Sequence, residues 1–150
     1  MYQGPCPPST DAVRGHRFTV LVFCAREIQP YLPDHLLRGL DVLYVPLNDS
    51  FNEPMTDAEW DLAHGAGREV ARLTALGGRS LVTCAAGLNR SGIVNAIALH
   101  YRFGCSGAGA IAQIRATRGP QALSNPSFER RLVKLGSRRR RPHAAAGPAS

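Results

Sequence analysis

The 150-residue sequence contains no apolar run long enough to span a membrane, and its first residues lack the charged-then-apolar pattern of a secretory signal. We therefore expect a cytoplasmic protein without a membrane span. Its four cysteines and five histidines are scattered, and neither set has the paired spacing of a metal site. The sequence predicts no metal and no other cofactor. With 44% hydrophobic residues, the chain can form one domain around its own core.

Lysine is almost absent, and the positive charge is concentrated at one end of the chain. The formal net charge is +7, yet no acidic residue follows Glu129, and seven of the 18 basic residues lie beyond it. Positions 1–129 therefore hold 11 basic and 11 acidic residues. The run Arg138–Arg141 and the Pro-, Ala- and Gly-rich residues after it predict a disordered basic tail over 137–150. Such a run can hold nucleic acid or another acidic surface, and a solvated tail without a partner is the alternative.

Hydrophobic patterns predict a single folded domain with an α/β architecture. Residues 1–16 contain three prolines and no periodicity, and predict a flexible arm ahead of a domain at 17–136. Continuous apolar and β-branched runs predict strands at 18–23, 42–47 and 80–83. A helix is predicted to begin at the capping box of Thr56 and to end at Gly77. Further helices are predicted at 34–39, 93–101, 106–117 and 127–135. Strands that alternate with helices predict a central, mostly parallel sheet flanked by helices, with its site at the strand carboxyl ends.

The most informative segment runs from Cys84 to Gly92, between the strand at 80–83 and the apolar helix at 93–101. Backbone N–H groups at such a helix start lack partners, and the helix dipole favours an anion there. Arg90 adds a planar, two-pronged donor for phosphate oxygens. A thiol in that field ionises more easily, and the thiolate is the nucleophile. The segment predicts attack on a bound phosphate ester, with a buried structural cysteine as the alternative.

Two further side chains suit this chemistry. Asp49 follows the strand at 42–47, at the same edge of the sheet as Cys84, and is the best candidate for the acid that protonates the leaving group. A turn-forming role is the alternative for Asp49, and Asp41, at a strand entrance, is the fallback acid. Ser91 can bond the sulfur, and N-terminal helix capping is its alternative role.

The segment from Cys84 to Ser91 resembles the C-x5-R-S/T phosphate loop of the cysteine-dependent protein tyrosine phosphatases. Its Ala-Gly centre and the short chain resemble the dual-specificity branch most closely. The resemblance extends from about Phe18 to Leu135 and implies a phosphatase catalytic domain at 17–136 that forms a phosphocysteine intermediate.

The resemblance also implies a role for each residue of the site. Cys84 is the nucleophile, Asp49 is the general acid on the loop after a strand, and Ser91 helps the sulfur to leave. The substrate phosphate is bound by Ala85, Ala86, Gly87, Leu88, Asn89 and Arg90.

Residues around the loop match the family in part. The family supports its phosphate loop with an arginine and an asparagine near the end of the domain, and Arg118 and Asn125 match that segment, with a surface arginine and a turn asparagine as the alternatives. The family usually has histidine before the cysteine, where this chain has Thr83. Because that histidine organises the loop, we expect a working but slower enzyme. Whether Cys24 or Cys105 protects an oxidised catalytic cysteine stays open.

These residues predict a protein phosphatase that acts on phosphotyrosine and, through a shallow pocket, on phosphoserine and phosphothreonine. The pocket is expected to be shallow because the chain lacks a long flanking loop. Phosphoinositides suit it less, since residues 85–89 contain no lysine or arginine. One alternative is an RNA 5′-triphosphatase-like enzyme, which Gly87–Arg90 also resembles and which the arginine tail suits. The other is a catalytically weak pseudophosphatase that binds phosphoproteins, which Thr83 favours.

Overall fold

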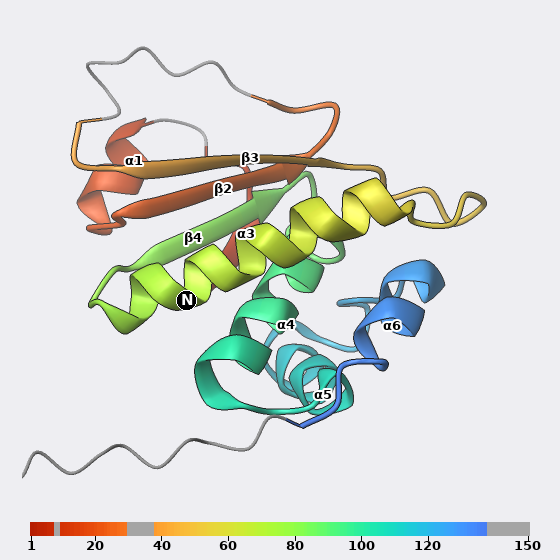
Figure 1. Ribbon diagram of the computed structural model, residues 1–150. Coiled ribbons are helices and arrows are strands. Elements are labelled where there is room, and N and C mark those ends of the chain that lie inside the picture. Colours follow the sequence, from red (N-terminus) through yellow and green to blue (C-terminus); the bar gives the residue numbers. More distant parts are fainter. Residues whose placement is uncertain (8–9, 30–37, 138–150) are drawn as a thin grey trace, which may run out of the picture.

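A four-stranded parallel sheet lies at the centre of the computed structural model, which describes residues 1–7, 10–29 and 38–137 (Figure 1). Every neighbouring pair of strands runs parallel, so the carboxyl ends of all strands meet at one edge of the sheet. The predicted α/β fold is confirmed. In their order across the sheet, the strands are β1 (Tyr2–Pro5), β4 (Ser80–Cys84), β2 (Val20–Ala25) and β3 (Asp41–Leu47).

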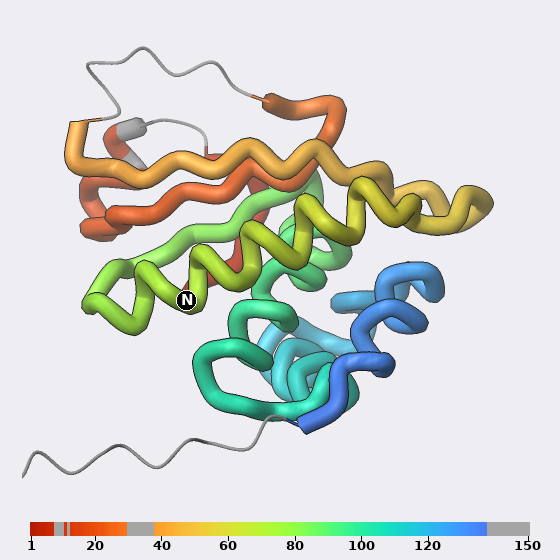
Figure 2. The backbone as a smooth tube through the Cα atoms, in the orientation of Figure 1, coloured from red at the N-terminus to blue at the C-terminus, as the bar shows by residue number. Residues whose placement is uncertain are grey.

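Helices cover both faces of the sheet, because the side chains of β2 alternate between two buried clusters. Val20 and Val22 pack in the larger cluster, together with α3 and α4. Leu21 and Phe23 pack in a smaller cluster with Val13 of α1. Figure 2 shows α5 and α6 against α4, on the side away from the sheet. The helices are α1 (Thr10–Gly15), α3 (Asp57–Ala75), α4 (Arg90–Phe103), α5 (Gly107–Arg118) and α6 (Pro126–Leu132).

The two long helices of the larger cluster are fixed by a cap and by close packing. The predicted capping box is present: Thr56 Oγ1 accepts a hydrogen bond from the N–H of Glu59, and Glu59 Oε2 accepts one from the N–H of Thr56. Gly67 of α3 lies so near α4 that a Cβ there would be 2.5 Å from Cγ2 of Ile97. As predicted, α4 is buried nearly all round. Among the described residues, no helix is both long and apolar enough to cross a membrane.

The N-terminal residues differ from the flexible arm that the sequence predicted over 1–16. Tyr2–Pro5 forms edge strand β1, which pairs with β4 from Tyr2–Leu81 to Pro5–Cys84, and α1 follows it. The prediction is wrong because Tyr-Gln-Gly-Pro has no apolar alternation, and backbone pairing holds it in the sheet instead. The predicted basic tail over 137–150 and the predicted helix over 34–39 lie almost entirely outside the described residues.

Candidate active site

The carboxyl end of β4 brings Cys84 to the start of α4. The thiol is buried, with 3% of the residue exposed, and its Sγ lies 3.3 Å from Oγ of Ser91. Ser91 is itself fully buried, so this hydroxyl is held beside the sulfur. Thr83 Oγ1 donates a hydrogen bond of 3.0 Å to the carbonyl of Val22. Thr83 therefore ties β4 to β2 immediately before the cysteine and does not reach into the loop.

The loop between β4 and α4 rests on the edge strand β1. Gly87 has a φ of +69°, and a Cβ there would lie 2.7 Å from the Cα of Gly4, so no larger residue fits. Gln3 Nε2 donates to the carbonyls of Gly87 and Leu88, at 2.9 and 3.2 Å. In a trans peptide the N–H points opposite to its carbonyl. The N–H groups of Leu88 and Asn89 therefore point away from Gln3, on the side where an anion can bind.

The first turn of α4 keeps its amide donors free of a side-chain cap. Asn89 is the N-cap residue, yet its side chain makes no capping hydrogen bond. Its Oδ1 instead accepts from the N–H and Oγ of Ser124 and the N–H of Asn125, at 2.9, 3.3 and 3.4 Å. Uncapped N–H groups at the positive end of a helix form an anion site. Asn89 thus fastens the loop to the segment ahead of α6 and leaves those donors to a ligand.

Arg90 is buried at this site and is held by a carboxylate that the sequence analysis missed. Its Nη2 donates to Glu27 Oε1 at 2.7 Å, and its Nη1 donates to Glu27 Oε2. Nη1 also lies 3.4 Å from the carbonyl oxygen of Leu47. Nε is buried and has no hydrogen-bond partner in the described part of the chain. Burial opposes the charged form, but the hydrogen bonds and charge of Glu27 outweigh it and raise the pKa of Arg90.

Glu27 follows the carboxyl end of β2, the same edge from which Cys84 emerges. The hydrogen bond from Arg90 is the main reason that the pKa of Glu27 lies below its ordinary value. Its position after a buried strand was the one sequence signal that could have identified it, since such carboxylates gather at this edge.

Asp49 lies beside Arg90, as its place after β3 predicted. Its Oδ2 is 3.9 Å from Nε of Arg90, and its Oδ1 accepts a hydrogen bond of 3.0 Å from Nδ2 of Asn125. Asn125 also donates to the carbonyl of Ser50, and its Oδ1 accepts from the N–H of Ser127 at the start of α6. The structure therefore brings Asn125 to the loop that carries Asp49, where it fixes that loop and caps α6.

The contact expected of Arg118 is made by Arg115. Arg115 donates to the carbonyls of Ala122 and Leu123 and pairs with Glu129, which holds the segment that Asn89 contacts. Arg118, one turn further along α5, is exposed and lies at the rim of a separate cavity. Sequence spacing could not choose between the two arginines, because both lie in the last turns of the same helix.

The four cysteines of the chain are all free thiols. Cys24 is fully buried, and burial, followed by the negative charge of Cys84, raises its pKa against a smaller opposing effect of Arg90. Burial also raises the pKa of Cys105, whose carbonyl is hydrogen-bonded to Nδ1 of His100 at 2.8 Å. Cys24 is thus within electrostatic reach of the Cys84 thiol.

The fold is similar to that of solved phosphatase structures, although no family model and no curated protein matches the sequence. Human DUSP28 aligns with 89% of this chain and 88% of its own, at 24% identity and a TM-score of 0.71. DUSP15 aligns with 88% and 80%, at 22% identity and a TM-score of 0.69. The active form of Tk-PTP covers 88% of both chains, at 26% identity and a TM-score of 0.66. The chain has the fold of the dual-specificity cysteine phosphatases.

Proposed function

We propose that the protein is a cysteine-dependent phosphatase that hydrolyses phosphotyrosine in proteins, and phosphoserine and phosphothreonine as well. One observation carries the proposal: Cys84 and Arg90, at the two ends of the loop between β4 and α4, meet Asp49, from the loop after β3, at the carboxyl edge of the sheet. The sulfur lies 3.3 Å from Ser91 Oγ, and Nε of Arg90, which has no hydrogen-bond partner among the described residues, forms an ion pair of 3.9 Å with Oδ2 of Asp49. A nucleophile, a cation for phosphate oxygens and an acid are the three groups that this reaction needs.

In the first step, the Cys84 thiolate attacks phosphorus and the bond from phosphorus to the ester oxygen breaks. The loop amides and Nε of Arg90 stabilise the charge on the three equatorial oxygens. Asp49 gives its proton to the departing oxygen, which leaves as an alcohol or phenol. The phosphoryl group is now bonded to sulfur.

In the second step, water attacks the phosphocysteine and Asp49, now ionised, takes the proton from that water. The phosphorus–sulfur bond breaks, and the electron pair returns to the sulfur. Ser91 Oγ stabilises the departing thiolate by a hydrogen bond. Inorganic phosphate leaves, and the enzyme returns to its starting state.

Features around the site support a protein substrate with an aromatic side chain. Phe51 lies two residues after Asp49 and is 60% exposed, which offers an aromatic surface beside the acid. Loop residues 85–89 carry no basic side chain to meet the additional phosphates of an inositol lipid. The shallow pocket expected from the short chain would admit the shorter phosphoserine and phosphothreonine too.

The nucleophile is tested with an aryl phosphate in the presence of a metal chelator. Cys84→Ser should lower turnover by about 10³-fold or more, since the hydroxyl is a far weaker nucleophile. Cys105→Ser, which changes a free cysteine outside the site, should keep parental turnover. A Cys84→Ser variant as fast as the parent would overturn the proposal.

The acid is tested with a series of aryl phosphates whose leaving groups differ in pKa. Asp49→Asn should lower kcat by about 10²–10³-fold for the poorest leaving groups and much less for nitrophenol. Asp61→Asn, on the exposed face of α3, is the matched control.

A phosphopeptide panel then tests the substrate class. Release of γ-phosphate from triphosphate-ended RNA, with phosphopeptides untouched, would contradict the assignment.

A further inference from the structure

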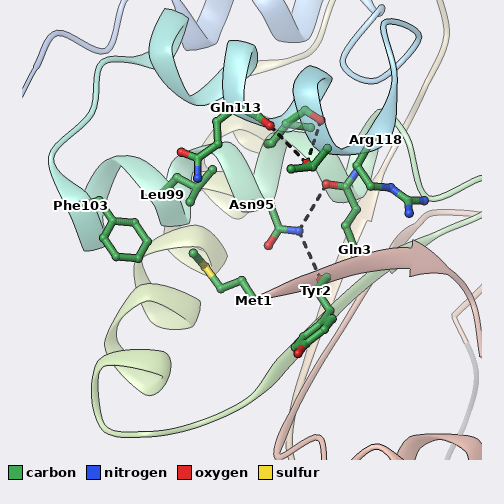
Figure 3. Close-up of a pocket in the computed structure, with 10 residues that line it drawn as sticks. Met1, Tyr2, Gln3, Asn95, Leu99, Phe103, Gln113 and Arg118 are labelled. Carbon is green, nitrogen blue, oxygen red and sulfur yellow. Dashed lines mark hydrogen bonds between the residues drawn. The ribbon is translucent and has the colours of Figure 1, made fainter.

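A cavity of about 430 Å³, separate from the catalytic residues, lies between β1, α4 and α5 (Figure 3). None of the catalytic side chains lines it. Its volume is within the range of small-molecule sites, roughly 300–1,000 Å³. Its walls combine apolar side chains with an amide and a cation: Met1, Leu99, Phe103, Gln113, Ile114 and Arg118.

A buried acceptor without a partner points into this cavity. Asn95 of α4 is only 5% exposed, and its Nδ2 lies 3.3 Å from the carbonyl oxygen of Tyr2 and 3.4 Å from Oε1 of Gln3. Both of these atoms are acceptors, so the amide nitrogen must face them and the amide oxygen must face the other way. Figure 3 shows that oxygen turned toward Met1. It has no hydrogen-bond partner among the residues that the structure describes.

An unsatisfied buried acceptor is costly, and a ligand that brings a donor removes the cost. We propose that this cavity binds a small aromatic acid that carries a hydroxyl group. The hydroxyl donates to Asn95 Oδ1, the ring packs on Leu99 and Ile114, and the carboxylate pairs with Arg118 at the rim. The described residues that line the cavity include no acidic side chain that would repel the carboxylate.

The same side chains connect the cavity to the phosphate loop. Asn95 is hydrogen-bonded to Gln3 Oε1, and Gln3 Nε2 donates to the carbonyls of Gly87 and Leu88. A ligand that fixes the Asn95 amide also fixes Gln3, and so favours the loop arrangement whose N–H groups face the anion. Occupation of the cavity therefore strengthens phosphate binding at the loop, and phosphate strengthens ligand binding by the same factor.

The probe is 4-hydroxyphenylacetate, measured by titration calorimetry and by the methyl resonances of Ile114 and Leu99. Inorganic phosphate is kept saturating, so that the catalytic loop is occupied and cannot hold the acid. We expect saturable binding and methyl shifts. Phenylacetate, which lacks the hydroxyl, and 4-hydroxyphenylethanol, which lacks the carboxylate, should each bind about tenfold more weakly.

Variants of Asn95 and Arg118 test which side chain contacts the hydroxyl group of the probe and which contacts its carboxylate. Asn95→Leu should weaken the probe about tenfold and make it bind no better than phenylacetate. Arg118→Gln, at an exposed position that does not endanger folding, should weaken the probe about tenfold but leave 4-hydroxyphenylethanol unchanged. Arg72→Gln, an exposed arginine on α3, should bind like the parent. No saturable binding up to about 10 mM, or equal affinity in Arg118→Gln and the parent, would overturn the site.

The coupling between the cavity and the phosphate loop is tested separately. The probe should tighten inorganic phosphate binding about fivefold in the parent, and Gln3→Leu should abolish this tightening while the probe still binds. An unchanged phosphate affinity with the probe bound would overturn the connection. Failure of the enzyme to turn over phosphopeptides would leave these binding results intact, so the two proposals can fail independently.

Discussion

At the residue scale, Arg90 is held in place before any substrate arrives. Glu27 accepts hydrogen bonds from both Nη atoms, and Leu47 supplies a carbonyl oxygen, so that Nε is the buried guanidinium donor that makes no hydrogen bond to the described part of the chain. An arginine held in this way loses little side-chain freedom when phosphate binds, which lowers the cost of binding. Glu27 is about half exposed, so water can reach the ion pair and weaken its electrostatic part. Its main contribution is therefore orientation.

Replacing Glu27 tests this orientation. Glu27→Gln should lower kcat/KM about tenfold, because the guanidinium loses its two-pronged partner and samples unproductive positions. The measurement is steady-state hydrolysis of an aryl phosphate, with Glu53→Gln as the matched control, since the carboxylate of Glu53 accepts a solvent-exposed hydrogen bond from Nδ2 of Asn48. A rise in kcat/KM would instead mean that Glu27 competes with the substrate phosphate for Arg90.

At the element scale, the start of α3 fixes the loop that carries Asp49. Glu59 closes the capping box with Thr56, and its Oε1 also accepts a hydrogen bond of 2.9 Å from the N–H of Asn48. One carboxylate therefore joins the end of β3 to the beginning of α3. Burial opposes its charged form, but the N–H groups of Thr56 and Asn48 outweigh burial, so its pKa lies below the ordinary 4.5.

The lowered pKa of Glu59 predicts how stability depends on pH. A carboxylate whose pKa is lowered by folding stabilises the protein above its unfolded pKa, and this contribution disappears as the pH falls through the folded pKa. Glu59→Gln should lower Tm by about 3 °C at pH 7 and by less at pH 3, because the contribution of the charged carboxylate decreases as the pH falls below 4.5. Asp61→Asn, on the exposed face of the same helix, is the matched control for the loss of one carboxylate. An equal Tm loss at both pH values would contradict the assignment.

Alanine substitutions at two glycines of α3 distinguish the effect of helix propensity on stability from the effect of helix packing. An alanine Cβ at Gly65 would meet nothing within 4 Å, whereas one at Gly67 would lie 2.5 Å from Ile97 Cγ2 of α4. Gly65→Ala should stabilise the protein by about 0.5–1 kcal/mol through propensity alone. Gly67→Ala should destabilise it by about 1–3 kcal/mol, because α4 must move away. Denaturant unfolding measures both, and a stabilising Gly67→Ala would show that the helices do not pack this closely.

At the scale of the whole molecule, the sequence predicted the elements that have strong local patterns. The three apolar strands, the capped helix α3 and the buried helix α4 were each identified, because each is defined by neighbouring residues. The loop from Cys84 to Arg90 was identified for the same reason. Asp49 could be placed beside it because parallel strands end at one edge of the sheet.

The missed features depend on contacts between residues that are far apart in the sequence. Glu27 is 63 residues from Arg90, and Gln3 is 84 residues from Gly87. Arg115 and Arg118 have similar local surroundings, and only the tertiary fold decides which one supports Leu123. Strand β1 is held by backbone pairing with β4, and no pattern of side chains in the sequence indicates such pairing.

The pairing of β1 with β4 can be tested by removing β1. Strand β1 supports the phosphate loop. A chain that lacks residues 1–5 therefore loses the pairing with β4 and the hydrogen bonds from Gln3 to the loop. Its Tm and its kcat/KM for an aryl phosphate should both fall, the latter about tenfold or more, because the loop amides are no longer held toward the anion. Gly4→Ala is the control, since a Cβ there meets nothing within 4 Å. A shortened chain with parental Tm and turnover would restore the view of these residues as a flexible arm, and it would also remove the structural basis for a ligand in the cavity beside Asn95.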